Sequence, residues 1–138
     1  MSAAKNWSRE NLAWAAGIFE GEGCITRRHK TQTNLVMTMT DEDVVRKFHS
    51  IIGHGRVYGP YTNHSGVKPQ WRWVCTGSRH CIAVLAALWC FLGKRRQERA
   101  AVAFRELALI RPGRKPKTKN VPIQLFQSPN SSVLGLTP

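Results

Sequence analysis

The chain has few acidic side chains. Only 8 of its 138 residues are Asp or Glu, against 21 Lys or Arg, and the formal net charge is +13 at pH 7. Six of the acids lie before residue 44, so the rest of the chain is almost purely cationic. This imbalance predicts a polyanionic partner, with nucleic acid as the first candidate. An anionic membrane surface fits less well, because no long amphipathic basic helix precedes or follows the predicted fold.

Long apolar runs and metal-binding or cofactor motifs are missing too. No stretch reaches the roughly 18 apolar residues of a membrane span, and the N-terminus has no signal-peptide core. We therefore expect a protein of the cytoplasm, an organellar matrix or a nucleoid, neither secreted nor bound to membranes. The four cysteines lack CxxC spacing and form no zinc pattern with the five histidines, so they are predicted to be reduced core thiols. No dinucleotide loop and no organic cofactor are expected.

The stretch Ala13–Ile25, AWAAGIFEGEGCI, is the most informative part of the chain. Its small residues Ala13, Gly17 and Gly21 recur every four positions, so one face of a helix there carries almost no side chain and allows close approach of another backbone. Gly21 and Gly23 are predicted to release the chain from the helix. Carboxylates at a helix C-terminus oppose the macrodipole, which favours a role in holding a divalent cation. A plain core helix with two solvated glutamates is the structural alternative.

The remaining pattern repeats a helix–strand–strand unit. Ser8 is predicted to cap a helix over 9–19, followed by a strand over 24–30, a turn at 32–34 and a strand over 35–40. Asp41 is predicted to cap a helix over 42–52, and strands follow over 56–61 and 68–76. A helix capped by Ser78, a break at Gly93 and a last helix to about residue 110 complete the domain. We predict an α+β fold with a duplicated αββ unit over 1–110, and a basic, proline-rich tail over 111–138.

Two segments of the chain resemble the LAGLIDADG homing endonucleases. The segment AAGIFEGEG over 15–23 is similar to the signature of that family, with Glu20 and Glu22 in its two acid positions, where glutamate replaces aspartate. The segment FLGKRRQERAAVAF over 91–104 is similar to the start of the family's final helix. The resemblance implies a saddle-shaped antiparallel sheet and a site-specific endonuclease that cuts double-stranded DNA with Mg²⁺ or another divalent cation such as Mn²⁺. Because only one acidic motif is present, it implies an enzyme that acts as a homodimer on a pseudo-palindromic target, encoded either by an intron or by a free-standing gene.

The resemblance also implies roles for single residues. Glu22, Lys94 and Asp41 would be catalytic, and Glu22 with Gly21 would hold the metal. The dimer interface would contain Ala13, Gly17, Glu20 and Gly21. Lys94 equally fits a contact to backbone phosphate, and capping of a helix explains Asp41 without catalysis. Val45 stands where relatives often carry a basic residue, which departs from the family pattern.

In the family, the concave face of the sheet reads DNA bases, and the chemistry of this sequence suits that use. Arg can bridge the O6 and N7 of guanine, and Asn or Gln can pair with adenine. The predicted DNA-binding residues are Thr26, Arg28, Lys30, Gln32, Asn34, Thr38, Arg56, Tyr58, Gln70 and Arg72. Taken singly, each of these also fits a solvated strand position. The rival function is a non-catalytic DNA- or RNA-binding protein, such as a regulator or an intron maturase, on the same scaffold; a basic ribosome-associated protein would need no acid at position 22.

Overall fold

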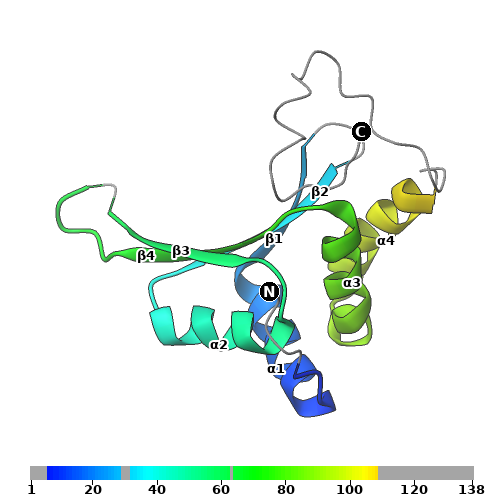
Figure 1. Cartoon of the computed structure of the whole chain (residues 1–138), viewed down its shortest axis with the longest axis horizontal. Coiled ribbons are helices and arrows are strands. Elements are labelled where there is room, and N and C mark those ends of the chain that lie inside the picture. The colour runs from blue at the N-terminus through cyan, green and yellow to red at the C-terminus, as the bar shows by residue number, and fades with distance from the viewer. Residues whose placement is uncertain (1–5, 29–31, 63, 109–138) are drawn as a thin grey trace, which may run out of the picture.

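Two helix–strand–strand units and three further helical segments make up the computed structural model, which describes residues 6–28, 32–62 and 64–108 (Figure 1). The first unit consists of α1 (Arg9–Glu22), β1 (Gly23–Arg28) and β2 (Gln32–Met39). The second consists of α2 (Glu42–Ile52), β3 (Arg56–Tyr61) and β4 (Gln70–Cys75). After them come α3 (Ser78–Leu88), the 3₁₀ helix η1 (Trp89–Phe91) and α4 (Lys94–Ala108). The predicted α+β fold with a duplicated αββ unit is confirmed.

The four strands form one antiparallel sheet in the order β1-β2-β4-β3. Each unit contributes a hairpin, and the second strands of the two hairpins pair at the centre, where Thr38 lies opposite Arg72. Figure 1 shows the two hairpins running in clearly different directions, so the sheet is strongly twisted. Because side chains alternate along each strand, the register sends one set to the helices and the other to the opposite face.

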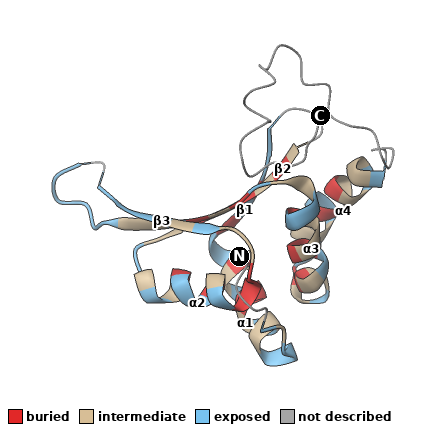
Figure 2. Ribbon diagram, in the orientation of Figure 1, coloured by how far each residue is buried: buried red, intermediate tan, exposed pale blue. Residues whose placement is uncertain are grey.

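The hydrophobic core lies between the sheet and the helices (Figure 2). From the sheet it takes Ile25, Leu35, Met37, Trp73 and Cys75, which all point to the same side. Helices α1 and α2 cover these residues. The ring of Phe48 meets that of Trp73 edge-on, with centroids 4.9 Å apart, and Phe19 lies 6.4 Å from Phe48. The other face of the sheet therefore stays clear of this core.

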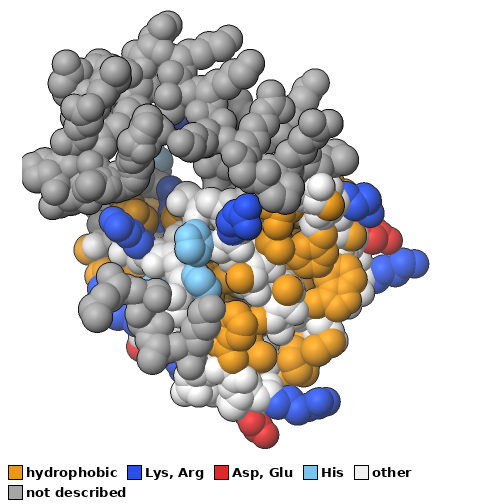
Figure 3. Space-filling model, turned by 45° about the vertical axis from the view of Figure 1, so that its right-hand side comes forward, with side chains coloured by type: hydrophobic (Ala, Val, Ile, Leu, Met, Phe, Trp, Pro, Cys, Tyr) orange, Lys and Arg blue, Asp and Glu red, His pale blue; other side chains and the backbone are white. Residues whose placement is uncertain are grey.

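The final helical segments complete the helical layer: α3 packs against α1 and the central strand β2, η1 against α1, and α4 against α3 and the edge strand β1. The residues from Cys81 to Leu92 are all apolar, so α3 and η1 bury one side and leave apolar atoms on the other. Figure 3 shows hydrophobic side chains gathered on one face of the molecule. Ile82, Trp89 and Phe104 are partly buried and pack against the core. At the far end of α4, an ion pair joins Glu106 to Arg27 of β1. No helix within the described ranges has the length and apolar character of a membrane span.

Several local predictions need correction. Helix α1 continues to Glu22 instead of ending at residue 19, and Gln32–Asn34 belong to β2 instead of a turn. The N-cap of α3 is Gly77, with Ser78 as the first helical residue. Asp41 does precede α2, but its side chain makes no capping hydrogen bond. Of the predicted core thiols, Cys75 and Cys81 are buried, whereas Cys24 and Cys90 are exposed. The predicted tail over 111–138 lies outside the described residues.

Candidate active site and nucleic-acid interface

The acidic segment forms the last turn of α1. Glu20, Gly21 and Glu22 are all helical, and Gly23 follows in an extended conformation with its amide N–H bonded to the carbonyl of Phe19. The prediction that Gly21 releases the chain from the helix is therefore wrong, because Gly21 is still helical. The chain leaves the helix at Gly23, where only glycine fits, because a Cβ there would collide with the ring of Phe19. Glu22 is thus held directly before the first strand of the sheet.

The small-residue face of α1 is open. Ala13, Gly17 and Gly21 are all exposed, and a Cβ built on either glycine would meet no atom within 4 Å. The opposite side of the helix buries Ala15, Ala16 and Phe19. No described residue therefore packs on the bare stripe, and within the described part of the chain this face is not that of a plain core helix.

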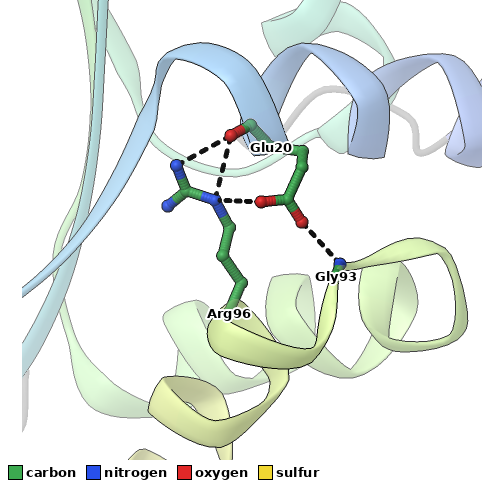
Figure 4. A network of polar contacts seen from close by, with 3 residues as sticks. All are labelled: Glu20, Gly93 and Arg96. Carbon is green, nitrogen blue, oxygen red and sulfur yellow. Dashed lines mark hydrogen bonds and ion pairs between the residues drawn. The ribbon is translucent and has the colours of Figure 1, made fainter.

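Glu20 has a different environment from Glu22, two residues later. Its carboxylate accepts hydrogen bonds from the backbone N–H of Gly93 and from Nε of Arg96, the latter at 2.8 Å (Figure 4). The guanidinium of Arg96 also donates to the Glu20 carbonyl, at 2.8 and 3.2 Å, and lies over the ring of Phe19. Glu20 therefore connects α1 to α4 inside one chain. Its predicted place in a dimer interface stays a prediction.

The connections of the fold relate the backbone positions of Glu22, Asp41 and Lys94. The register pairs Gly23 with Met37, so Glu22 and Asp41 both flank the open end of the β1–β2 hairpin. Lys94 begins α4 next to Gly93, whose amide is bonded to the end of α1. All three side chains are exposed. Glu22 makes no hydrogen bond or ion pair with any described residue, so its carboxylate oxygens are available to a ligand.

A single chain does not assemble a complete metal site. Among the described residues, no group of three or more His, Cys, Asp or Glu side chains could hold a metal ion. What one chain offers at the acidic turn is the Glu22 carboxylate and the Gly21 carbonyl, which belongs to the last helical turn and so has no i+4 amide partner in α1. These are the hard oxygen donors that suit Mg²⁺. The donor set fits the cation in type, and a second copy of the turn would double it.

The open face of the sheet collects the residues that were predicted to contact DNA. The register places Thr26 opposite Asn34, Arg28 opposite Gln32, and Tyr58 opposite Arg72. All lie on the side away from the buried core residues. The predicted residues that share this face are Thr26, Arg28, Gln32, Asn34, Thr38, Arg56, Tyr58, Gln70 and Arg72. Lys30 lies outside the described residues. The shared face is a structural finding, and contact with DNA stays a prediction.

Tyr61 was missed by the sequence analysis. A bulge at Gly59 and Pro60 changes the alternation of β3, so Tyr58 and Tyr61, three residues apart, pair with Arg72 and Gln70 and face the same side. Both tyrosines are exposed, and the Arg72 guanidinium lies 5.4 Å from the centre of the Tyr61 ring. Strict period-two alternation puts Tyr61 on the wrong face. The Gly-Pro pair inside the strand was the available signal.

Val45, which stands where relatives often carry a basic residue, belongs to the hydrophobic core. Val45 is fully buried beneath the sheet, so no cation at this position could reach the acidic turn without disrupting the packing. Its neighbour Arg46 points outward, where it pairs with Glu42 at 3.7 Å and lies over Trp71. Lys94, by contrast, directly follows Gly93, whose backbone N–H is bonded to Glu20 of α1.

Several solved structures with the same architecture are homing endonucleases. No family model and no curated protein matches the chain. The homing endonuclease I-CvuI, solved with the I-CreI target and 2 mM Mg with the DNA not cleaved, aligns over 79% of this chain and 87% of its own, with 19% identity and a TM-score of 0.50. The group I intron-encoded I-CeuI bound to DNA aligns over 77% of this chain and 57% of its own, with 16% identity and a TM-score of 0.53.

A third structure agrees with these two. The archaeal intron-encoded homing endonuclease I-Vdi141I, complexed with DNA, aligns over 77% of this chain and 87% of its own, with 13% identity and a TM-score of 0.50. At such low identities the likeness concerns the arrangement of helices and strands. The shared arrangement agrees with the motif and with the order of elements. The chain therefore has the fold of the LAGLIDADG homing endonucleases.

Proposed function

We propose that this protein is a site-specific DNA endonuclease of the homing type, which cuts double-stranded DNA as a homodimer with a divalent cation. The observation that carries the proposal is the placement of Glu22. This carboxylate is exposed, is unpaired within the described chain, and ends a helix whose bare face is open, directly before a sheet with a polar, cationic outer face. A protein that only bound DNA would gain nothing from a free carboxylate beside phosphates.

The outer face of the sheet is the proposed DNA-binding surface. Its twisted strands suit the major groove, where a β-ribbon fits and every base pair presents a distinct pattern of donors and acceptors. Arg28, Arg56 and Arg72 supply guanidinium groups, while Asn34 and Gln70 supply amides. The formal charge of +13 supports attraction to the phosphates at a distance.

The open stripe on α1 supports the homodimer. Because Gly17 and Gly21 carry no side chain, a second copy of the helix can approach this face backbone to backbone about a two-fold axis. That crossing would bring the two copies of Glu22 to the same place and the two sheets end to end. A two-fold protein of this kind matches a pseudo-palindromic DNA target.

The acidic turns would hold the cation. Glu22 and the Gly21 carbonyl of each chain supply oxygen donors for Mg²⁺, with Mn²⁺ as a substitute. When bound, the cation lowers the pKa of water and neutralises charge on the reacting phosphate. Lys94 would hold the scissile phosphate by its positive charge, and Asp41 would orient solvent at the open end of the hairpin.

The decisive experiment is a cleavage assay on a random DNA library with Mg²⁺, with sequencing of the cut ends. The wild type is expected to cut a small set of related sites, and Glu22→Gln to bind those sites with cleavage reduced at least ~100-fold. Glu98→Gln, the same change at an exposed acid of α4, should cut like the wild type. Equal cleavage by Glu22→Gln and the wild type would contradict the proposal.

One observation favours the rival function, a non-catalytic DNA- or RNA-binding protein such as a regulator or intron maturase. Val45 is buried where a catalytic scaffold of this type often carries a cation, so the basic surroundings of the acidic turn are reduced. In the same assay, this rival predicts sequence-selective binding by the wild type with no cut ends, at any Mg²⁺ or Mn²⁺ concentration. Binding to the intron transcript instead of DNA would identify the maturase.

A further inference from the structure

The contact between Glu20 and the start of α4 is a reciprocal cap between two helices. The Glu20 carboxylate lies at the C-terminus of α1, where the macrodipole opposes it, but at the N-terminus of α4, where the macrodipole favours it. Arg96 lies in the first turn of α4, where the macrodipole opposes its positive charge. Its guanidinium reaches the Glu20 carbonyl at the end of α1, where the macrodipole favours it. Each helix therefore supplies the charge that the end of the other helix lacks.

Gly93 explains why the cap comes from another helix. Its carbonyl accepts the first hydrogen bond of α4, from Gln97 at 3.0 Å, so Gly93 stands in the N-cap position without a side chain that could cap. A Cβ on Gly93 would lie 2.9 Å from a carboxylate oxygen of Glu20. The glycine thus leaves room for an acid that arrives from α1.

The cap lies between the two charges on which the proposed cleavage depends. Glu22 follows Glu20 by two residues, and Lys94 is the next residue after Gly93. The side chain of Arg96 is only 11% exposed, so the contact is sheltered from solvent on the α4 side. Among the described residues, Gln97 also donates to the Trp89 carbonyl at 2.7 Å at this end of α4, the Arg96 guanidinium lies over the Phe19 ring, and the buried residues Ala100 and Ala103 lie further along.

We propose that Glu20, with Arg96 and Gly93, is a positioning residue that fixes the start of α4, and with it Lys94, relative to the end of α1 that carries Glu22, so that cleavage depends on Glu20 while DNA binding does not. The inference rests on the proposed function for its catalytic part. Both oxygens of the Glu20 carboxylate accept hydrogen bonds from α4 and its N-terminal glycine, so in this proposal Glu20 is not a metal ligand. The two acids of the motif therefore have separate tasks, one structural between helices and one chemical.

The test uses Glu20→Ala in the full chain, because alanine favours the helix and keeps α1 formed. Single-turnover cleavage is expected to fall about 10- to 100-fold, the size of loss expected from a small displacement of a catalytic group. The Kd for target DNA in Ca²⁺ should stay unchanged. Amide hydrogen exchange should accelerate roughly ten-fold over residues 94–97 and nowhere else in α4.

Gly93→Ala provides a second variant at the same contact. Its methyl group would displace the Glu20 carboxylate, and since that carboxylate ends a flexible side chain, the fold should tolerate the change. Gly93→Ala should slow cleavage in the wild type and cost nothing further in Glu20→Ala. Additive losses from the two changes would overturn the proposal, because they would show that the residues act separately.

Glu106→Ala is the matched control, since it removes the ion pair with Arg27 at the other end of α4. It should speed exchange near residue 106 and leave the cleavage rate unchanged. Wild-type cleavage and exchange rates in Glu20→Ala would overturn the proposal, and so would parallel losses of cleavage and DNA binding. If the wild type cuts no DNA, the proposed function fails, and the exchange rates over 94–97 still decide whether Glu20 holds the start of α4.

Discussion

Glu20 and Glu22 show how far residue type and spacing can be interpreted. Both are glutamates in the last turn of one helix, and the unfavourable macrodipole there favours a role in holding a divalent cation, which the resemblance assigns to Glu22. For Glu20 the compensation is the guanidinium of Arg96, 76 positions away in the chain, and no local pattern could have revealed it. For Glu22 no described residue provides compensation, and its role as a metal ligand stays a prediction.

Arg72 offers a test of base recognition at a single residue. Its guanidinium lies over the Tyr61 ring, and Tyr58 is its cross-strand neighbour on the outer face of the sheet. On such a face, Arg suits a guanine, whereas Gln suits an adenine. We predict that Arg72→Gln changes one guanine position in each half-site to adenine, with a ~10- to 100-fold change in relative affinity, measured by selection from a randomised DNA library.

Two variants separate recognition from charge at this position. Arg72→Lys keeps the positive charge but loses the planar pair of donors, so it should weaken the guanine preference without creating an adenine preference. Tyr61→Leu removes the ring and should relax the same position without selecting a new base. An unchanged base profile in Arg72→Gln would exclude Arg72 as a reader of sequence.

At the scale of helices and strands, much of the fold could be predicted because each signal was local. Helix α2 begins and ends at the predicted residues, since Asp41 precedes an amphipathic pattern and Gly53 ends it in a left-handed conformation. The prediction failed where a tertiary contact decides. The glycines of α1 indicated an early exit, but Gly21 stays helical while the end of α1 is tied to α4. The bulge in β3, which moves Tyr61 to the outer face, is a different case, because the Gly59-Pro60 pair inside the strand is a local signal for it.

The open face of α1 leads to a prediction about assembly. Gly17→Leu should abolish the dimer, since a large side chain in the stripe prevents close approach of two helices. The same change should raise the stability of the monomer by ~1 kcal/mol, because leucine favours a helix over glycine and a Cβ at this position meets no atom within 4 Å. Sedimentation or size-exclusion with light scattering would measure the mass, and thermal unfolding the stability.

Gly17→Ala is the control for this prediction. It brings nearly the same gain in helix propensity with a side chain no larger than that of Ala13, so the dimer should persist or weaken only slightly. A Gly17→Leu protein that remains dimeric would contradict helix crossing at α1. A Gly17→Leu protein that does not fold would contradict the finding that the face of α1 at Gly17 has room for a side chain.

For the molecule as a whole, the alternation of polar and apolar residues was enough to predict the outer face of the sheet. The strand pattern alone separates Thr26 and Arg28 from Ile25, and Arg72 from Trp73, because period two survives in β1, β2 and β4. The predicted grouping of Glu22, Asp41 and Lys94 could not be derived from alternation. The three residues lie at the ends of different helices, far apart in the chain, and only the resemblance to a family grouped them.

The distribution of charge leads to the last prediction. If the outer face binds the DNA backbone, log K for binding a duplex should fall linearly with log salt concentration, and each lost phosphate contact should reduce the slope by about 0.9. The double variant Arg28→Gln, Arg56→Gln removes two exposed cations of that face and should reduce the slope by about 2 per chain. Arg46→Gln with Lys47→Gln removes the same charge from α2, where both cations lie against tryptophan rings, and should leave the slope unchanged. Fluorescence anisotropy over a series of salt concentrations would measure each slope. Equal reductions by both pairs would show that net charge, and not the outer face of the sheet, determines binding.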